Sequence, residues 1–307
     1  MKQQIVELAE ELCEHAPRMW EAENDAAKVI KRELDERGVD YEVQPYGVVY
    51  PRFTEYRLEV DGEEVECLPA GLESGKIESK TVIDNLHISG RDFSGPNINF
   101  NPVSEGLSKP TFYPAPALTV SRKDVPKVLE ADEIEGTLEV EREQHRSENI
   151  ILGETEDPER LIFTHYDSWW GAFLDNALSV SLLVHLAPEL DLENDCIVFA
   201  GSEEFSDEEI YWCYGYRKFE EEYFDAVRNA ETITVVDTVG RGDTQVADSE
   251  ELIREGLVLN YDGYVEKTEM LIGEFDKIME IYHSPLDTRE AATHIDDAIE
   301  TVRSYLL

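Results

Sequence analysis

Basic residues are scarce in this sequence of 307 residues: 27 Lys and Arg stand against 69 Asp and Glu, and the formal charge is -42. Such a surface repels the phosphates of nucleic acids and of anionic lipids, so neither nucleic acid nor membrane partners are expected. The acidic residues are spread along the whole chain rather than gathered in a tail. In molar salt the Debye length falls to about 3 Å, and self-repulsion largely disappears. The composition therefore indicates a halophilic protein, and the alternative is an ordinary acidic one.

This negative charge predicts that stability depends on salt. We expect the protein to be loosened or unfolded at about 50 mM KCl, and to gain stability and activity toward molar KCl or NaCl, because screening removes the repulsion. The melting temperature over a salt series, followed by circular dichroism, measures the effect. A melting temperature that does not change between low and molar salt would contradict the halophilic interpretation.

Cysteines are also few, and long apolar runs are missing. The four cysteines form no C-x-x-C pair, so a zinc site built of thiolates is not expected. A reduced, cytoplasmic protein with buried thiols is the expectation. The opening segment MKQQIVELAEELCEH lacks the apolar core of a signal peptide, and no run of about 18 apolar residues follows. Neither export nor a membrane span is therefore expected.

Two amphipathic helices are predicted at the start of the chain. Apolar residues recur at helical spacing over residues 2–15 and 22–37, and Gly38 is placed to end the second helix. From residue 41 to about 143, short alternating segments such as EYRLEV and GTLEVER are broken by Gly, Pro, Asn and Ser. This pattern is typical of a β-rich module with long loops.

From about residue 149 apolar strands alternate with helical segments. The strand segments RLIFTHYDS, CIVFAGSEE and TITVVDTVG each end in polar residues. Buried strands that alternate with helices predict an α/β fold, a mixed and mainly parallel central sheet with helices on both faces. Residues 1–40 and 147–307 are expected to form this domain, and residues 41–146 are expected to form a smaller, inserted β-rich domain.

A His or a carboxylate follows each of these three strands. In such sheets the site lies beyond the carboxyl ends of the strands, so these side chains are expected to meet there. Imidazoles and carboxylates are the ligands that Zn²⁺ takes at catalytic sites. With one Asp from GAFLDN and one His from YHSPLDT, the candidates are His165, Asp167, Asp175, Glu203, Glu204, Asp237 and His283.

Spacing suggests roles within two pairs of candidates. His165 and Asp167 are two residues apart, so they point to the same side, and Asp167 can accept a hydrogen bond from the imidazole. Glu203 and Glu204 are adjacent and can serve as one ligand and one general base. An isolated acidic residue is usually solvated surface, but these follow apolar strands, where an unpaired charge is costly. For Asp175 the alternative is a helix cap.

The order of these motifs resembles a known family. HYDS, GAxxDN, a strand ending in EE, VDxVG and YHSPxDT together resemble the two-zinc exopeptidases, which include bacterial leucyl aminopeptidases, glutamate carboxypeptidase-like enzymes and glutaminyl cyclases. The resemblance covers residues 1–45 loosely and 149–240 closely, and it returns at 281–305. It implies a zinc-exopeptidase-like fold. The module at 41–146 sits where some members carry an inserted domain, and it resembles a protease-associated domain.

The resemblance implies a role for each candidate residue. Glu203 would be the general base, Asp167 would orient His165, and a cis peptide would join Asp175 to Asn176. Two zinc ions, or other divalent metals, would be bound. The implied ligands are His165 and Asp237 for one ion, Glu204 and His283 for the other, and Asp175 as the bridge.

The implied activity is hydrolysis of a terminal peptide bond in a peptide with a free terminus, most simply as an aminopeptidase. Two alternatives remain: a glutaminyl cyclase-like acyltransferase with one zinc, and a non-catalytic peptidase-like binding protein. The family's usual Gly-Leu and Gly-Ser after the paired glutamates are replaced by FSDEEIYWCYGYRKF. Trp169 and Trp170 either wall the substrate pocket or pack within their loop.

Overall fold

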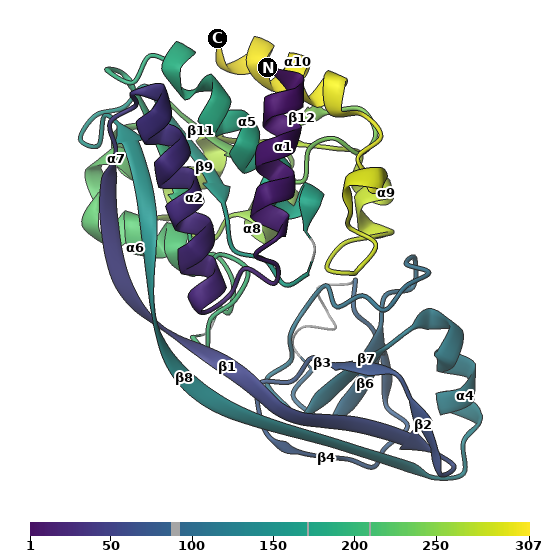
Figure 1. Ribbon diagram of the computed structural model, residues 1–307. Coiled ribbons are helices and arrows are strands. Elements are labelled where there is room, and N and C mark those ends of the chain that lie inside the picture. Colours follow the sequence, from purple (N-terminus) through teal and green to yellow (C-terminus); the bar gives the residue numbers. More distant parts are fainter. Residues whose placement is uncertain (87–92, 171, 209) are drawn as a thin grey trace. The chain divides into compact units, whose positions relative to one another are not determined.

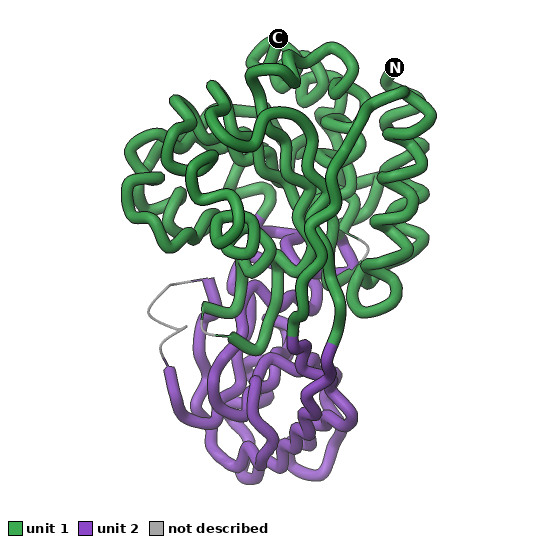
Figure 2. The backbone as a smooth tube through the Cα atoms, turned by 90° about the vertical axis from the view of Figure 1, so that its left-hand side faces the viewer, with its two compact units in different colours: residues 1–48, 145–278, 287–307 green, residues 49–144, 279–286 purple. Residues whose placement is uncertain are grey.

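The computed structural model describes residues 1–86, 93–170, 172–208 and 210–307. These divide into two compact units, drawn in different colours in Figure 2. Unit 1 consists of residues 1–48, 145–278 and 287–307, and unit 2 of residues 49–144 and 279–286. In the described part of the chain, no helix is long and apolar enough to cross a membrane.

A mixed, mainly parallel sheet forms the centre of unit 1. Strands β13, β11, β9 and β10 are parallel neighbours, β12 pairs with β13 in the antiparallel direction, and β8 does so with β10. The path through the sheet is β12-β13-β11-β9-β10-β8-β1-β2, in which β2 is Glu63–Val65, and β4 (Gly75–Ile77) pairs with β8 off this path. The predicted α/β fold class is confirmed. The other strands of this path are β1 (Glu42–Val60), β8 (Ile134–Gly153), β9 (Arg160–His165), β10 (Asp195–Ala200), β11 (Thr232–Val236), β12 (Gln245–Ala247) and β13 (Thr268–Ile272).

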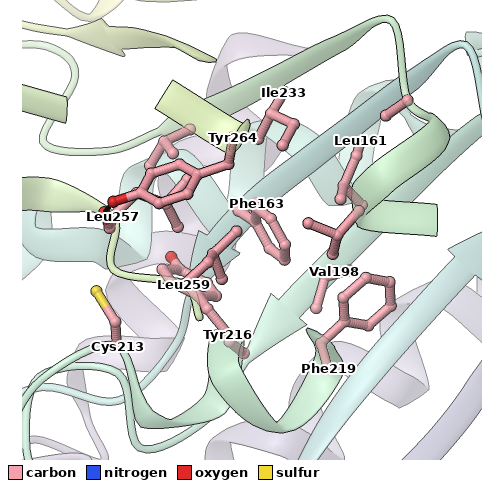
Figure 3. Close-up of a cluster of buried hydrophobic side chains, with 14 of the residues drawn as sticks. Leu161, Phe163, Val198, Cys213, Tyr216, Phe219, Ile233, Leu257, Leu259 and Tyr264 are labelled. Atoms are coloured by element: carbon pink, nitrogen blue, oxygen red, sulfur yellow. Dashed lines mark hydrogen bonds between the residues drawn. The ribbon is translucent and has the colours of Figure 1, made fainter. Parts of the chain in front are cut away.

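Helices cover both faces of this sheet (Figure 1). On one face, Phe163 of β9 lies 4.7 Å from the Tyr216 ring and 5.6 Å from the Phe219 ring of α6, between centroids. These side chains belong to the buried cluster in Figure 3. Helices α1, α2 and α5 pack together on the other face. The α-helices that lie wholly or mostly in unit 1 are α1 (Lys2–Cys13), α2 (Glu21–Arg37), α5 (Leu178–Leu186), α6 (Tyr214–Glu222), α7 (Phe224–Asn229), α8 (Glu250–Gly256), α9 (Phe275–Met279) and α10 (Ile295–Leu306).

The two helices predicted at the start of the chain are confirmed as α1 and α2. The apolar residues of the helical pattern are buried, such as Ile5, Leu8 and Leu12 of α1, and α2 buries one charged residue besides, Glu23. Gly38 ends α2 with a φ of +67°, a left-handed conformation that a residue without Cβ adopts at little cost. The chain then turns directly into β1.

The prediction that residues 41–143 form only short segments is wrong for two strands, β1 and β8. β1 has 19 residues and β8 has 20, and they lie side by side in the sheet. The sequence suggested breaks because β1 contains Pro45, Gly47 and Pro51. Prolines are tolerated in a strand where no backbone N–H is needed for the ladder, so a local breaker need not end a strand.

Unit 2 contains a second, smaller sheet in the order β3-β7-β6-β5. Its core includes Leu58, Ile98, Leu118 and Leu138, and Val128 of α4 packs among them. Residues 279–286, which carry the candidate His283, group with this unit. The remaining elements are β3 (Cys67–Pro69), β5 (Val82–Asp84), β6 (Asn97–Phe100), β7 (Ala117–Val120) and α4 (Val125–Glu130).

Candidate metal centre

Four of the predicted residues, His165, Glu203, Glu204 and Asp237, lie at the carboxyl ends of three parallel strands in unit 1. His165 is the last residue of β9, and its Cα partner across the ladder is Ala200, the last residue of β10. Glu203 and Glu204 follow β10 within four residues, and Asp237 follows β11 directly. Because parallel strands end at the same edge of a sheet, the strand register alone brings these groups to one place.

Three of these side chains surround a common point. Nε2 of His165 lies 3.2 Å from Oδ1 of Asp175 and 3.5 Å from Oδ2 of Asp237. One ligand atom from each residue lies within 4.8 Å of the other two, and His165 and Asp175 are buried. Oδ1 of Asp237 is buried without a hydrogen-bond partner. A buried carboxylate oxygen without a donor needs another positive partner, and this donor set suits zinc.

The charges at this cluster also favour a cation. Burial alone would lower the pKa of His165, but the carboxylates of Asp237 and Glu203 outweigh it and hold that pKa well above its usual range. Burial raises the pKa of Asp237, and the charge of Asp175 raises it further. Several carboxylates therefore compete for one imidazolium, and a divalent ion would offset their repulsion more fully than a proton can.

Asp167 connects the His165 imidazole with the paired glutamates. Its Oδ1 lies 3.4 Å from Nδ1 of His165, and its Oδ2 accepts a hydrogen bond of 2.9 Å from the backbone N–H of Glu204. A carboxylate on Nδ1 favours the tautomer whose Nε2 carries the lone pair, the atom that faces Asp175 and Asp237. The contact with Glu204 was not predicted. Through it Asp167 also fixes the loop after β10.

Glu203 and Glu204 are both buried, so neither is an ordinary surface acid. Burial is the main reason why the pKa of Glu203 is raised to about 8. Burial and then the charge of Asp175 raise the pKa of Glu204 well above its usual range. A carboxylate with a raised pKa accepts and returns a proton near neutral pH, as a general base must.

Cys213 is a close neighbour of Glu203 that the sequence pattern did not single out. Its Sγ lies 3.1 Å from Oε1 of Glu203, and its backbone N–H donates to the carbonyl of Glu203 at 2.6 Å. The thiol is buried and its pKa is held well above the usual range, first by burial and then by the charge of Glu203. Cys213 therefore stays a thiol and donates to the carboxylate.

The chain around Asp175 differs from an ordinary helix start. The N-cap of α5 is Ala177, and no side chain caps that helix, so the helix-cap alternative for Asp175 is wrong. The peptide bond between Asp175 and Asn176 is cis, which confirms the prediction from the motifs. The Asn176 side chain donates to Oγ1 of Thr164 and to the carbonyl of Val236, and so ties this turn to β9 and β11.

Two distant charged residues hold the backbone of Asp175 from opposite sides. The N–H groups of Leu174 and Asp175 donate to the Asp287 carboxylate at 2.9 and 3.1 Å. The buried Arg18 guanidinium donates to the carbonyl of Asp175 at 3.5 Å and to that of Tyr166 at 2.5 Å. Burial is the first cause that raises the pKa of Asp287, to about 7. Asp175 is thus placed by its neighbours as well as by its own loop.

His283 is oriented within unit 2. Its Nδ1 lies 3.0 Å from the carbonyl of Lys109, and its own carbonyl accepts from the N–H of Lys109 at 3.2 Å. A carbonyl only accepts, so Nδ1 carries the proton and Nε2 carries the lone pair that a metal ligand needs. The ring also stacks on Tyr282, with 3.8 Å between centroids. The placement of Lys109 was not anticipated, because it lies in the inserted region.

The loop after β9 carries Trp169 and Trp170, for which the sequence allows either a pocket wall or packing within the loop. Trp169 is buried, and its ring centroid lies 5.0 Å from that of Phe205, which follows the paired glutamates. This contact joins the loops after β9 and β10. It accounts for Trp169 as packing, and the role of either indole toward a substrate stays a prediction.

Besides Lys109, three residues around the site were not singled out by the sequence analysis: Asp287, Arg18 and Cys213. Asp287 had a visible signal, because it belongs to the YHSPxDT motif. Arg18 and Cys213 had none, because Arg18 lies just before the predicted helix of residues 22–37 and the cysteine pattern predicts only a buried thiol. Their contacts join segments far apart in sequence, which no local pattern records.

Comparison with solved structures shows the fold of bacterial zinc aminopeptidases. A zinc aminopeptidase from Bacillus subtilis is similar with a TM-score of 0.67 and 14% identity over 98% of this chain and 93% of that chain. An aminopeptidase from Aneurinibacillus sp. strain AM-1 is similar with a TM-score of 0.63 and 16% identity over 98% and 91%. A glutaminyl cyclase from Porphyromonas gingivalis follows with 0.53 and 13% over 100% and 97%.

These similarities confirm, at the level of the fold, the resemblance predicted from the motifs. By sequence alone the chain matches no model of a protein family. It also has no match among curated proteins.

Proposed function

We propose that this protein is a zinc-dependent exopeptidase that removes residues from the amino end of peptides. The observation that carries the proposal is the cluster of buried His165, buried Asp175 and half-buried Asp237 beside Glu203, a carboxylate with a raised pKa. The similarity in fold to zinc aminopeptidases supports it. A group of three ligand-type side chains next to a candidate base is the arrangement that metal-assisted hydrolysis needs.

The proposal includes two zinc ions. Asp175 would bridge them, and the orphaned Oδ1 of Asp237 supports its role as a ligand. The lone pair on Nε2 supports the same role for His283. The full set of proposed ligands is His165, Asp237, Asp175, Glu204 and His283.

The chain's own residues divide the chemistry among them. Bound zinc would lower the pKa of a water toward about 7 and polarise the scissile carbonyl. Glu203 takes a proton from the attacking water and returns it to the leaving amine, a contribution of roughly 10²–10⁴-fold. Asp167 keeps His165 in the tautomer that presents Nε2. A second ion could also hold the free α-amine, which would restrict cleavage to the end of a chain.

A substrate screen tests the proposal. Dipeptides and aminoacyl-amides with a free amine should be hydrolysed in about 2–4 M salt, chosen to screen the surface charge. The same compounds with an acetylated amine should not react, and a chelator should abolish turnover until zinc is restored. Hydrolysis that persists without metal, or no hydrolysis of any free-amine substrate at about two zinc per chain, would contradict it.

The same samples separate the two alternatives. A glutaminyl cyclase-like enzyme would convert peptides that begin with Gln into their cyclised form with ammonia release, at about one zinc per chain. A non-catalytic binding protein would do neither. Two zinc per chain with hydrolysis favours the exopeptidase, because both His165 and Asp237 are then engaged.

A further inference from the structure

We propose that Glu23 is a positioning residue for the candidate base: its carboxylate fixes the turn at Ser202, from which the chain leads into Glu203. The role of Glu203 in this inference rests on the proposed function. The contacts of Glu23 do not rest on the proposed function, because they are hydrogen bonds that the structure shows inside unit 1.

Glu23 is a completely buried carboxylate on α2, far in sequence from the groups it contacts. Its Oε1 accepts hydrogen bonds from the backbone N–H of Ser202 at 2.6 Å and from Oγ of Ser147 at 2.9 Å. The hydroxyl of Ser202 also donates to Oε1, at 3.2 Å. Its Oε2 lies 2.7 Å from Nε2 of His145. One side chain thus connects α2, β8 and the loop after β10.

Packing alone does not explain an acid at this place. Burying a carboxylate is unfavourable unless its oxygens are well paired, and an apolar residue would fill the same space without that cost. Glu23 is paired on both oxygens, and the partner with the shortest contact is a backbone N–H rather than a side chain. The carboxylate therefore helps to fix the backbone conformation at Ser202.

That main chain has an unusual conformation. Ser202 has a φ of +50°, in the left-handed region that residues other than Gly, Asn and Asp seldom adopt. A Cβ on the preceding Gly201 would lie 2.5 Å from Oε1 of Glu23 and 2.4 Å from Oγ of Ser147. Glycine at position 201 is thus what lets the carboxylate approach, and a strong acceptor on the N–H favours the strained turn at 202.

The turn sets where the next two residues point. The carbonyl of Glu203 accepts from the N–H of Cys213 at 2.6 Å, and the N–H of Glu204 donates to Asp167 at 2.9 Å. Glu23 secures the side of the turn before Glu203, while Cys213 and Asp167 secure the side after it. A misplacement of about 1 Å in a reacting group can cost about 10²-fold in rate, so loss of the first anchor should appear in catalysis.

The test is Glu23→Gln, which keeps the size but puts an amide NH₂ where one of the two acceptor oxygens was. With the best dipeptide substrate, we expect kcat to fall about 10–100-fold while KM changes by less than about 2-fold and the zinc content is retained. Hydrogen exchange at the amides of residues 201–206 should become faster than in the unaltered protein. Glu21→Gln, on the exposed side of the same helix, is the matched control and should behave like the unaltered protein.

A second change asks whether Glu23 acts through Ser202. Glycine adopts a positive φ without strain, so Ser202→Gly should make the turn less dependent on its acceptor. The effects of Glu23→Gln and Ser202→Gly on kcat should then be less than additive. If Glu23→Gln does not fold, Ser147→Ala removes one donor from Oε1 and should lower kcat by several-fold with KM unchanged.

The outcomes separate this inference from the proposed function. A kcat for Glu23→Gln or Ser147→Ala equal to that of an active unaltered protein would overturn the positioning role, as would strict additivity with Ser202→Gly. If the unaltered protein hydrolyses nothing, the proposed function fails. Hydrogen exchange then decides alone: unchanged exchange at residues 201–206 in Glu23→Gln overturns the inference, and faster exchange supports a carboxylate that fixes this turn.

Discussion

Glu203→Gln should retain its zinc and lose at least about 10²-fold in kcat, the loss expected when a general base is removed. Glutamine keeps the shape of the side chain and cannot accept the proton. The Glu203 side chain is buried and its Oε1 accepts from the Cys213 thiol, and glutamine keeps an acceptor oxygen for that thiol, so the variant should fold. Steady-state kinetics of the purified variant in high salt measure kcat, and zinc analysis in the same buffer measures the metal content.

The control for this variant is Glu208→Gln, an exposed glutamate of the same loop, which should keep its turnover. If Glu203→Gln turns over like the unaltered protein, the assignment of the base is wrong. If it loses its zinc as well as its turnover, Glu203 is a ligand rather than a base. Either result would require another carboxylate near His165 to take the proton.

Asp175→Ala should lose zinc and activity together. Its carboxylate is 3.2 Å from Nε2 of His165, and it is proposed to bridge both ions, so its removal should weaken both. Removing a group that only hydrogen-bonds a metal ligand typically costs about 10–100-fold in metal affinity, and loss of a bridging ligand should cost at least as much. Zinc per chain, measured by mass spectrometry after dialysis against a weak chelator, gives the result directly.

Asp157→Ala, at an exposed position before β9, is the control and should bind zinc like the unaltered protein. Normal zinc content in Asp175→Ala would remove Asp175 from the ligand set. A folded, active variant would also remove the reason for proposing a shared carboxylate. The melting temperature should be compared in zinc-free samples, because bound metal itself stabilises a folded chain.

The site was predictable where local sequence determines position. His165 and Asp237 end or follow apolar strands, and the ends of parallel strands must meet at one edge of the sheet. The cis bond at Asp175 followed from the motifs, not from any physical pattern in the residues. What places Asp175 could not be predicted, because Arg18 and Asp287 reach it from opposite ends of the chain.

The fold was predictable to the same degree. Hydrophobic periodicity gave α1, α2 and the alternating strands and helices of unit 1, since each element shows its buried face in its own residues. It did not give the lengths of β1 and β8, where local breakers are overruled by pairing with a neighbouring strand. Which strands pair depends on the three-dimensional fold, and the pairing cannot be predicted from the local pattern of one sequence.

The contacts between Lys109 and His283 bear on how the chain could be shortened. A design that joined residue 48 directly to residue 145 would discard Lys109 and with it the carbonyl that holds the proton on Nδ1 of His283. The imidazole would remain in the sequence but could rotate or exchange tautomers. The inserted segment therefore cannot be removed without consequence for His283. A shortened chain must supply another acceptor for the Nδ1–H of that imidazole.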